Sequence, residues 1–139
     1  MSINSLLNVC KDNVDLGKLL VRITVAVMML PHGITKLPFF WGLSQASGTL
    51  VKSGLPGSLA FTAYIGEIIG PLLILIGYKA KFGAVLVIIT MVFAIILTSG
   101  TSLFGLDAYG GFKGEKQLLY IVASFAIIYL GSGKYSLEK

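Results

Sequence analysis

The stretch that decides the fold runs from Phe82 to Phe104 and reads FGAVLVIITMVFAIILTSGTSLF, without a single charged side chain. A helix needs about 20 apolar residues to cross the hydrocarbon core of a bilayer, and this stretch is long enough. Strands of a membrane barrel would alternate apolar and polar side chains in segments of about ten residues, which this stretch does not do. It therefore predicts a membrane-spanning helix.

Two further stretches have a similar length, at residues 16–37 and 57–77, and a fourth, 117–130, is shorter and needs flanking residues to make a span over about 115–131. The connection Tyr78–Lys81 is so short that the helices on either side of it must be antiparallel neighbours. Pro71 inside the second stretch predicts a kink, because proline removes a helical hydrogen bond. We therefore expect one domain over residues 1–139, with an all-α fold. Its expected architecture is an integral membrane four-helix bundle of antiparallel transmembrane helices.

The composition of the whole chain supports a membrane location. Of its 139 residues, 55% are apolar and 12% are charged, against about 25% charged in an ordinary soluble domain. Such a chain is too apolar to be intrinsically disordered, and one cysteine cannot make a disulfide scaffold. The net charge of +5 comes from scattered basic residues rather than from a basic stripe. We therefore expect the lipid bilayer, and no nucleic acid, as a partner.

The lysines suggest an orientation. With four spans, both termini share one side with the 78–81 connection, and that side carries six lysines against four on the other side. The positive-inside rule then places both termini in the cytoplasm. We expect a multi-pass protein of the cell membrane, which is the inner membrane in a Gram-negative cell.

Two ionisable side chains fall inside the predicted spans, and each is a candidate functional group because a charge in a bilayer is costly. Arg22 lies in the first span and Glu67 in the second. Counting helical rise from the span ends puts both near mid-membrane. We expect an Arg22–Glu67 ion pair, which could be structural or could form a functional polar pocket. Gly66 and Gly70 beside Glu67 should let a neighbouring helix approach closely.

A second polar set is expected where the spans meet the non-cytoplasmic face. It consists of His32, Lys36, Asp107 and Glu115. His32 could donate a hydrogen bond or handle a proton, because its reference pKa lies near neutrality. Glu115 could accept a proton or simply favour the start of the last helix. Lys36 is expected to be a cation that reaches water at the end of its helix. This set has no metal-ligand spacing, so no metal site is predicted.

The order of several short motifs resembles the DoxX-like membrane proteins over about residues 16–138. These motifs are Arg22 early in the first span, His32-Gly33-x-x-Lys36-Leu37 at its end, Glu67-Ile-Ile-Gly70 and Leu75-Ile-Gly77 in the second, Gly114-Glu115 before the fourth, and Gly131-Ser-Gly-Lys-Tyr-Ser-Leu-Glu138. The resemblance implies a four-helix inner-membrane protein. Some relatives are membrane subunits of a thiosulfate:quinone oxidoreductase, others are linked to redox or thiol-stress complexes, and many have no assigned activity.

Three functions follow as hypotheses. The first is a membrane subunit of a quinone-linked complex with thiosulfate- or thiol-related chemistry, which would need a redox partner subunit or a homo-oligomer. Its quinone pocket would use Arg22, Tyr64, Glu67 and Tyr120, and its candidate catalytic groups are Arg22, His32, Glu67 and Glu115. The second is a small proton-coupled transporter or exporter. The third is a non-catalytic membrane scaffold.

Overall fold

The computed structural model describes residues 3, 13–37, 42–98 and 102–138. The regular elements in these ranges are all helical. They are α2 (Val14–Ile34), α3 (Gly42–Lys52), a 3₁₀ helix η1 (Gly57–Thr62), a π-helical turn η2 (Ile65–Ile69), α4 (Gly70–Ile76), α5 (Ala80–Thr98) and α6 (Glu115–Leu130). An isolated bridge joins Leu106 to Phe112 in the connection before α6. The all-α class expected from the sequence is confirmed.

Local chemistry sets where these helices begin and end. The Asn13 side chain accepts a hydrogen bond from the Leu16 N–H at 3.0 Å and so caps the start of α2. Gly77 ends α4 in the left-handed conformation, with φ of 71°, which glycine adopts without steric cost. The Gly77 N–H donates to the carbonyls of Leu73 and Ile74, and the Tyr78 N–H also donates to that of Leu73. The turn that follows joins α4 to α5, as the short connection predicted.

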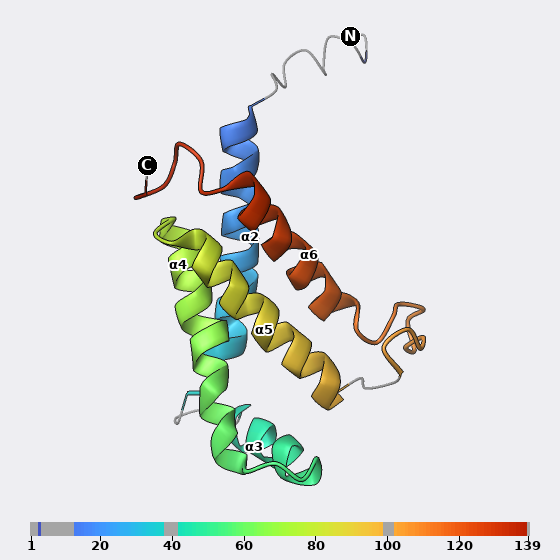
Figure 1. Ribbon diagram of the computed structural model, residues 1–139. Coiled ribbons are helices and arrows are strands. Elements are labelled where there is room, and N and C mark those ends of the chain that lie inside the picture. The colour runs from blue at the N-terminus through green and yellow to red at the C-terminus, as the bar shows by residue number, and fades with distance from the viewer. Residues whose placement is uncertain (1–2, 4–12, 38–41, 99–101, 139) are drawn as a thin grey trace.

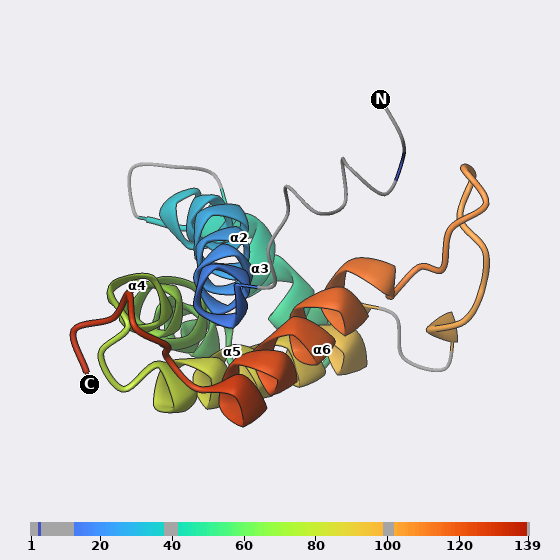
Figure 2. The ribbon, with the colours of Figure 1, turned by 90° about the horizontal axis from the view of Figure 1, so that it is seen from above.

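The long helices pack side by side (Figure 1). Helix α2 contacts α4 and α6, and α5 also contacts α4 and α6. Seen from above, α6 lies along α5, while α2 stands beside α4 (Figure 2). The start of α2, the α4–α5 turn and the C-terminal residues lie at one end, and α3 lies at the other (Figure 1).

Glycines bring α4 and α5 into close contact. A Cβ atom built on Gly70 would lie 3.0 Å from the Gly83 carbonyl oxygen, and one on Gly83 would lie 2.6 Å from the Gly70 carbonyl oxygen. A Cβ atom built on Gly66 would likewise clash with the Thr90 side chain of α5. The close approach expected at Gly66 and Gly70 is thus confirmed, with α5 as the neighbouring helix.

The outer surface of the helices is apolar. Exposed large hydrophobic side chains include Leu20, Val27, Ile89, Ile96 and Leu119. Within the described ranges, two helical segments are long and apolar enough to cross a membrane, Gly57–Ile76 and Ala80–Thr98. These two correspond to the second and third spans predicted from the sequence. The remaining two spans, and the four-helix bundle they would complete, stay predictions.

Candidate functional site

A cavity of about 720 Å³ lies where the end of α2 meets α3, the η1–η2 segment and α5. Its wall is mostly apolar, with contributions such as Leu86, Ile89 and Phe93 from α5. The charged side chains in its lining are Lys36 and Glu67, and His32 lies on the same wall. An apolar cavity of this size with a few convergent polar groups is the usual form of a small-molecule site.

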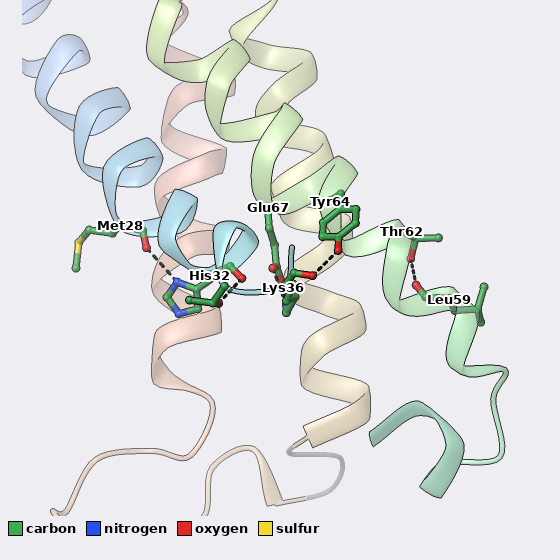
Figure 3. Close-up of polar contacts among 8 residues, drawn as sticks. Met28, His32, Lys36, Leu59, Thr62, Tyr64 and Glu67 are labelled. Atoms are coloured by element: carbon green, nitrogen blue, oxygen red, sulfur yellow. Dashed lines mark hydrogen bonds and ion pairs between the residues drawn. The ribbon is translucent and has the colours of Figure 1, made fainter. Parts of the chain in front are cut away.

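Lys36 and Glu67 form an ion pair on this wall (Figure 3). The Lys36 ammonium nitrogen lies 2.5 Å from each carboxylate oxygen of Glu67. The Glu67 side chain is 6% exposed and that of Lys36 is 22% exposed. A carboxylate this deeply buried needs a cationic partner, and Lys36 provides it. The pair is neutral overall but keeps one ammonium N–H for a further acceptor.

The backbone around Glu67 departs from an α-helix. Glu67 lies in the π-helical turn Ile65–Ile69, where the Gly70 N–H bonds the Ile65 carbonyl. In an α-helix the Glu67 carbonyl would accept from residue 71, but that residue is a proline without an N–H. The kink expected at Pro71 thus takes the form of a π turn. Single π turns of this kind are rare and are often found at functional sites.

Gly33 lets α2 approach this turn. A Cβ atom built on Gly33 would lie 2.7 Å from the Glu67 carbonyl oxygen and 2.5 Å from the Ile68 side chain. A larger residue would therefore push the helix away from Glu67. One helical turn further on, Lys36 is close enough to reach the carboxylate. The His32-Gly33-x-x-Lys36 motif therefore places Gly33 in the last turn of α2 and Lys36 in the turn directly after the helix.

Tyr64 and His32 complete the surroundings of the pair. The Tyr64 hydroxyl donates a hydrogen bond to the Lys36 carbonyl, so it fixes the backbone from which the lysine extends (Figure 3). The His32 ring contacts the Met28 carbonyl at 3.1 Å through Nδ1. It also meets the Tyr120 ring edge-on, with centroids 6.3 Å apart. Thus His32 links α2 to α6 beside the cavity.

The predicted Arg22–Glu67 pair is wrong. Arg22 is 1% exposed, and its guanidinium donates to four backbone carbonyls instead. These belong to Ile74 at 2.8 Å, Leu75 at 2.9 Å, Ser132 at 2.7 Å and Tyr135 at 2.8 Å. Two of them, Ile74 and Leu75, are among the last carbonyls of α4, where an α-helix runs out of its own N–H donors. Arg22 therefore joins α2 to the end of α4 and to the C-terminal segment.

The C-terminal residues are held at this same end by further bonds. The Leu137 and Glu138 N–H groups donate to the carbonyls of Ile76 and Gly77, each at 3.2 Å. The Glu138 carboxylate accepts from the Lys79 N–H at 2.7 Å. The Asp15 carboxylate accepts from the Lys134 N–H at 3.1 Å. Arg22 and the motif Gly131–Glu138 thus form one structural unit, separate from the cavity.

The expected outer set does not come together either. Lys36 turns to Glu67 rather than to the other members of the set. Asp107 accepts hydrogen bonds from the N–H groups of Tyr109 and Gly111 within its own turn. Glu115 is exposed in the first turn of α6, where its negative charge interacts favourably with the positive end of the helix dipole. No three potential metal ligands gather anywhere in the described ranges.

The sequence predicts eight candidate residues, and three of them line the cavity: His32, Lys36 and Glu67. Tyr64 and Tyr120 contact members of its wall. Lys36, which the sequence predicts to reach water, instead pairs with Glu67. Its position four residues after His32, in the turn that ends α2 beside the Glu67 segment, is the signal that could have revealed the pair.

Comparisons with known proteins show which family this sequence belongs to. The family model named DoxX matches residues 17–100, which include both Arg22 and the Lys36–Glu67 pair. A Bacillus subtilis (strain 168) protein, provisionally described as the oxidoreductase CatD, is 30% identical over 82 residues. That match covers 59% of this chain and 59% of the relative, so the chain aligns with little more than half of the relative's length. No solved structure matches the chain. By the family match, which spans more than half of its residues, the chain belongs to the DoxX family.

Proposed function

We propose that this protein is a membrane-embedded redox subunit that binds the headgroup of a lipid-soluble quinone in the cavity beside Lys36 and Glu67. The observation that carries the proposal is an apolar cavity of about 720 Å³ with one buried ion pair on its wall. The description of the Bacillus subtilis relative as an oxidoreductase supports the redox assignment. The comparisons support the family, and the ligand is our inference.

The chemistry of the cavity favours a neutral, apolar ligand with hydrogen-bond acceptors. The two charges in its lining cancel, so a small anion such as thiosulfate finds no net positive charge there. A quinone headgroup is flat and largely apolar, and its carbonyl oxygens accept hydrogen bonds. Lys36 keeps a donor for such an oxygen, because its ammonium has three N–H groups and Glu67 offers two acceptors.

The protein's own residues would bind the ligand and move protons. When bound, a quinone accepts two electrons and two protons, and we assign the electron donor to a redox partner subunit. Lys36 would orient one carbonyl of the headgroup through its ammonium. If Lys36 gives a proton to the reduced ring, the Glu67 carboxylate can take one from water and pass it to the neutral Lys36 amine, which restores the ion pair. The apolar walls from α5 would hold the ring and keep bulk water from it.

We also propose that α2 and α6 span the membrane with the other two long segments. Helix α2 has 21 residues and α6 has 16, which correspond to about 32 Å and 24 Å at 1.5 Å per residue. Both carry exposed apolar side chains such as Val27 and Val122. Of the three charged residues in α2, Asp15 and Lys18 lie near its start, and Arg22 is buried and bonded to carbonyl groups. The bundle would sit in the cell membrane with both termini in the cytoplasm.

Binding of short-chain quinones to the purified protein tests the proposal. We would titrate the protein in lipid nanodiscs with ubiquinone-2 and menaquinone-2 by calorimetry. We expect saturable binding that Lys36→Met weakens about tenfold, because one hydrogen bond to a charged donor contributes about 1.5 kcal/mol. Lys36→Arg should retain most of the affinity, because it keeps the charge and the donor.

A matched control is Lys113→Gln, which removes a lysine outside the cavity lining. Circular dichroism and thermal midpoints would establish that each variant folds. Absence of saturable binding by the wild-type protein, or equal affinity in Lys36→Met, would contradict the proposal. Proton-coupled uptake of a solute into vesicles without quinone binding would favour the transporter alternative instead.

A further inference from the structure

A second cavity, of about 800 Å³, lies at the opposite end of the helices from α3. It is formed where the start of α5 meets the C-terminal segment. Its lining includes three lysines, Lys79, Lys81 and Lys134, and one carboxylate, that of Glu138. Neither the quinone proposal nor the family match assigns a role to this cavity.

The carboxylates near this cavity are already engaged by backbone groups. Glu138 accepts from the Lys79 N–H, and Asp15, just outside the lining, accepts from the Lys134 N–H. No lysine ammonium of the lining forms an ion pair with a carboxylate in the described ranges. The three lysines therefore leave a net positive charge in the cavity that an anion can neutralise.

The C-terminal backbone adds a neutral donor. The Ser132 carbonyl points to the Arg22 guanidinium at 2.7 Å. In a trans peptide the C=O and the following N–H point in opposite directions, so the Gly133 N–H faces away from Arg22. Gly133 lines the cavity, and its N–H donates to no other described residue. Outward N–H groups beside cationic side chains are the usual composition of an anion site.

The backbone of the lysine-bearing turn is held in an unusual conformation. Lys79 has φ of 46° and is the one non-glycine residue with positive φ within the described ranges. Such a conformation costs free energy and persists only where the surroundings impose it. The Glu138 carboxylate does so by binding the Lys79 N–H. The turn is thus fixed with its lysine against the C-terminal segment.

The position of the cavity identifies the kind of anion. It adjoins the first turn of α5, a helix apolar enough to cross a membrane, and Phe82 in its lining is 56% exposed. Phosphate groups of lipids lie at this level, directly outside the hydrocarbon core. We propose that this cavity binds the phosphate headgroup of an anionic phospholipid, with Lys79, Lys81 and Lys134 as its ligands.

Native mass spectrometry of the full chain tests this site. The protein would be reconstituted in vesicles of phosphatidylcholine in which about one fifth of the lipid is anionic phosphatidylglycerol. It would then be extracted together with its bound lipid. We expect retained phosphatidylglycerol in the wild-type protein. Each lysine near an anionic surface contributes roughly fivefold in affinity, so removing three should weaken binding on the order of a hundredfold. We therefore expect almost no retained phosphatidylglycerol in the triple variant Lys79→Gln, Lys81→Gln, Lys134→Gln.

The control is the triple variant Lys52→Gln, Lys113→Gln, Lys116→Gln, which removes the same charge from residues outside this cavity. Equal retention in both triple variants would mean diffuse attraction and would overturn the site. Bound lipid should also survive about 0.5 M salt, where long-range attraction is screened. Displacement of the lipid by millimolar inorganic phosphate would assign the site to free phosphate and overturn the lipid assignment. The result is independent of quinone binding, because the two cavities share no lining residue.

Discussion

At the scale of single residues, two buried charges have separate partners. Arg22 donates to carbonyls at the end of α4 and in the C-terminal segment. Glu67 pairs with Lys36 beside the cavity. Ile74, which accepts from Arg22, lies about 10 Å along the helix from Glu67 at 1.5 Å per residue. The first charge holds the fold together, and the second is available to a ligand.

Arg22→Lys should destabilise the protein although it preserves the charge. A guanidinium has five N–H donors in a planar fork that can satisfy carbonyls on two sides, whereas an ammonium is a compact point charge with three donors. Losing one or two hydrogen bonds to a buried charged group costs about 3 kcal/mol. Unfolding followed by circular dichroism in detergent micelles measures the change. The exposed control Lys113→Gln should stay within about 0.5 kcal/mol of wild type, and a similar value for Arg22→Lys would contradict this role.

The Lys36–Glu67 contact predicts a coupled response. Glu67→Gln and Lys36→Met each leave one buried partner without its countercharge, while the double variant removes both charges. The double variant should therefore be more stable than the sum of the single losses predicts, by about 1–3 kcal/mol. Combining Glu67→Gln with Arg22→Lys should instead give additive losses, because these residues share no partner. The same unfolding assay measures both cycles, and additivity for Lys36 and Glu67 would show that they do not interact.

At the scale of helical elements, the end of α2 and the π turn form one unit. Gly33 allows the helix to approach the Glu67 backbone, and Pro71 removes the N–H that an α-helix would need at that turn. The Tyr64 hydroxyl then bonds the Lys36 carbonyl. Each of these contacts depends on the distance between α2 and the η2 segment. The geometry of the ion pair is thus set by backbone packing.

Two alanine substitutions in α2 separate this packing from helix propensity. Gly33→Ala would place a methyl group against the Glu67 backbone and should destabilise the protein and weaken quinone binding. Gly17→Ala meets no atom within 4 Å, so it should stabilise α2 by about 0.5–1 kcal/mol. Thermal midpoints of both variants provide the comparison. If both substitutions raise the midpoint, the close approach at Gly33 is not required.

The sequence predicts the helices well, but not which residues of neighbouring helices lie at the same level along their axes. Apolar stretches and the short Tyr78–Lys81 connection were sufficient for the all-α fold and for antiparallel α4 and α5. The partner of Arg22 was missed because depth was counted from the ends of the apolar stretches. Residues 57–63 extend beyond the end of α2 to pack on α3, so Gly33 rather than Arg22 lies level with Glu67. The partners of Arg22 are backbone carbonyls of two segments far away in the sequence, and every residue has a carbonyl, so no sequence pattern identifies them.

At the scale of the whole molecule, the two ends of the helices differ. One end holds the C-terminal segment, Arg22 and the lysine-lined cavity. The other end holds α3 and the cavity with the ion pair. Quinone chemistry and lipid anchoring would therefore take place at opposite membrane faces.

Reporter fusions test the orientation. A reporter joined after Lys139 and another inserted at Ser53, at the end of α3, should report opposite sides of the membrane. The side of Lys139 should be the cytoplasm, because six lysines against four favour that assignment. Signals from the same side for both positions would contradict the four-span arrangement.

The most direct test of the central claim is to locate the bound quinone. The protein in lipid vesicles would be labelled with a photoreactive azidoquinone, and the labelled peptides would be mapped by mass spectrometry. The account predicts labels on residues that line the first cavity, such as Thr90 and Phe93 of α5 and Leu50 of α3. Excess unlabelled ubiquinone-2 should suppress these labels. Labels confined to the Arg22 end of the molecule, or labels that excess ubiquinone-2 leaves unchanged, would contradict a quinone site beside Lys36 and Glu67.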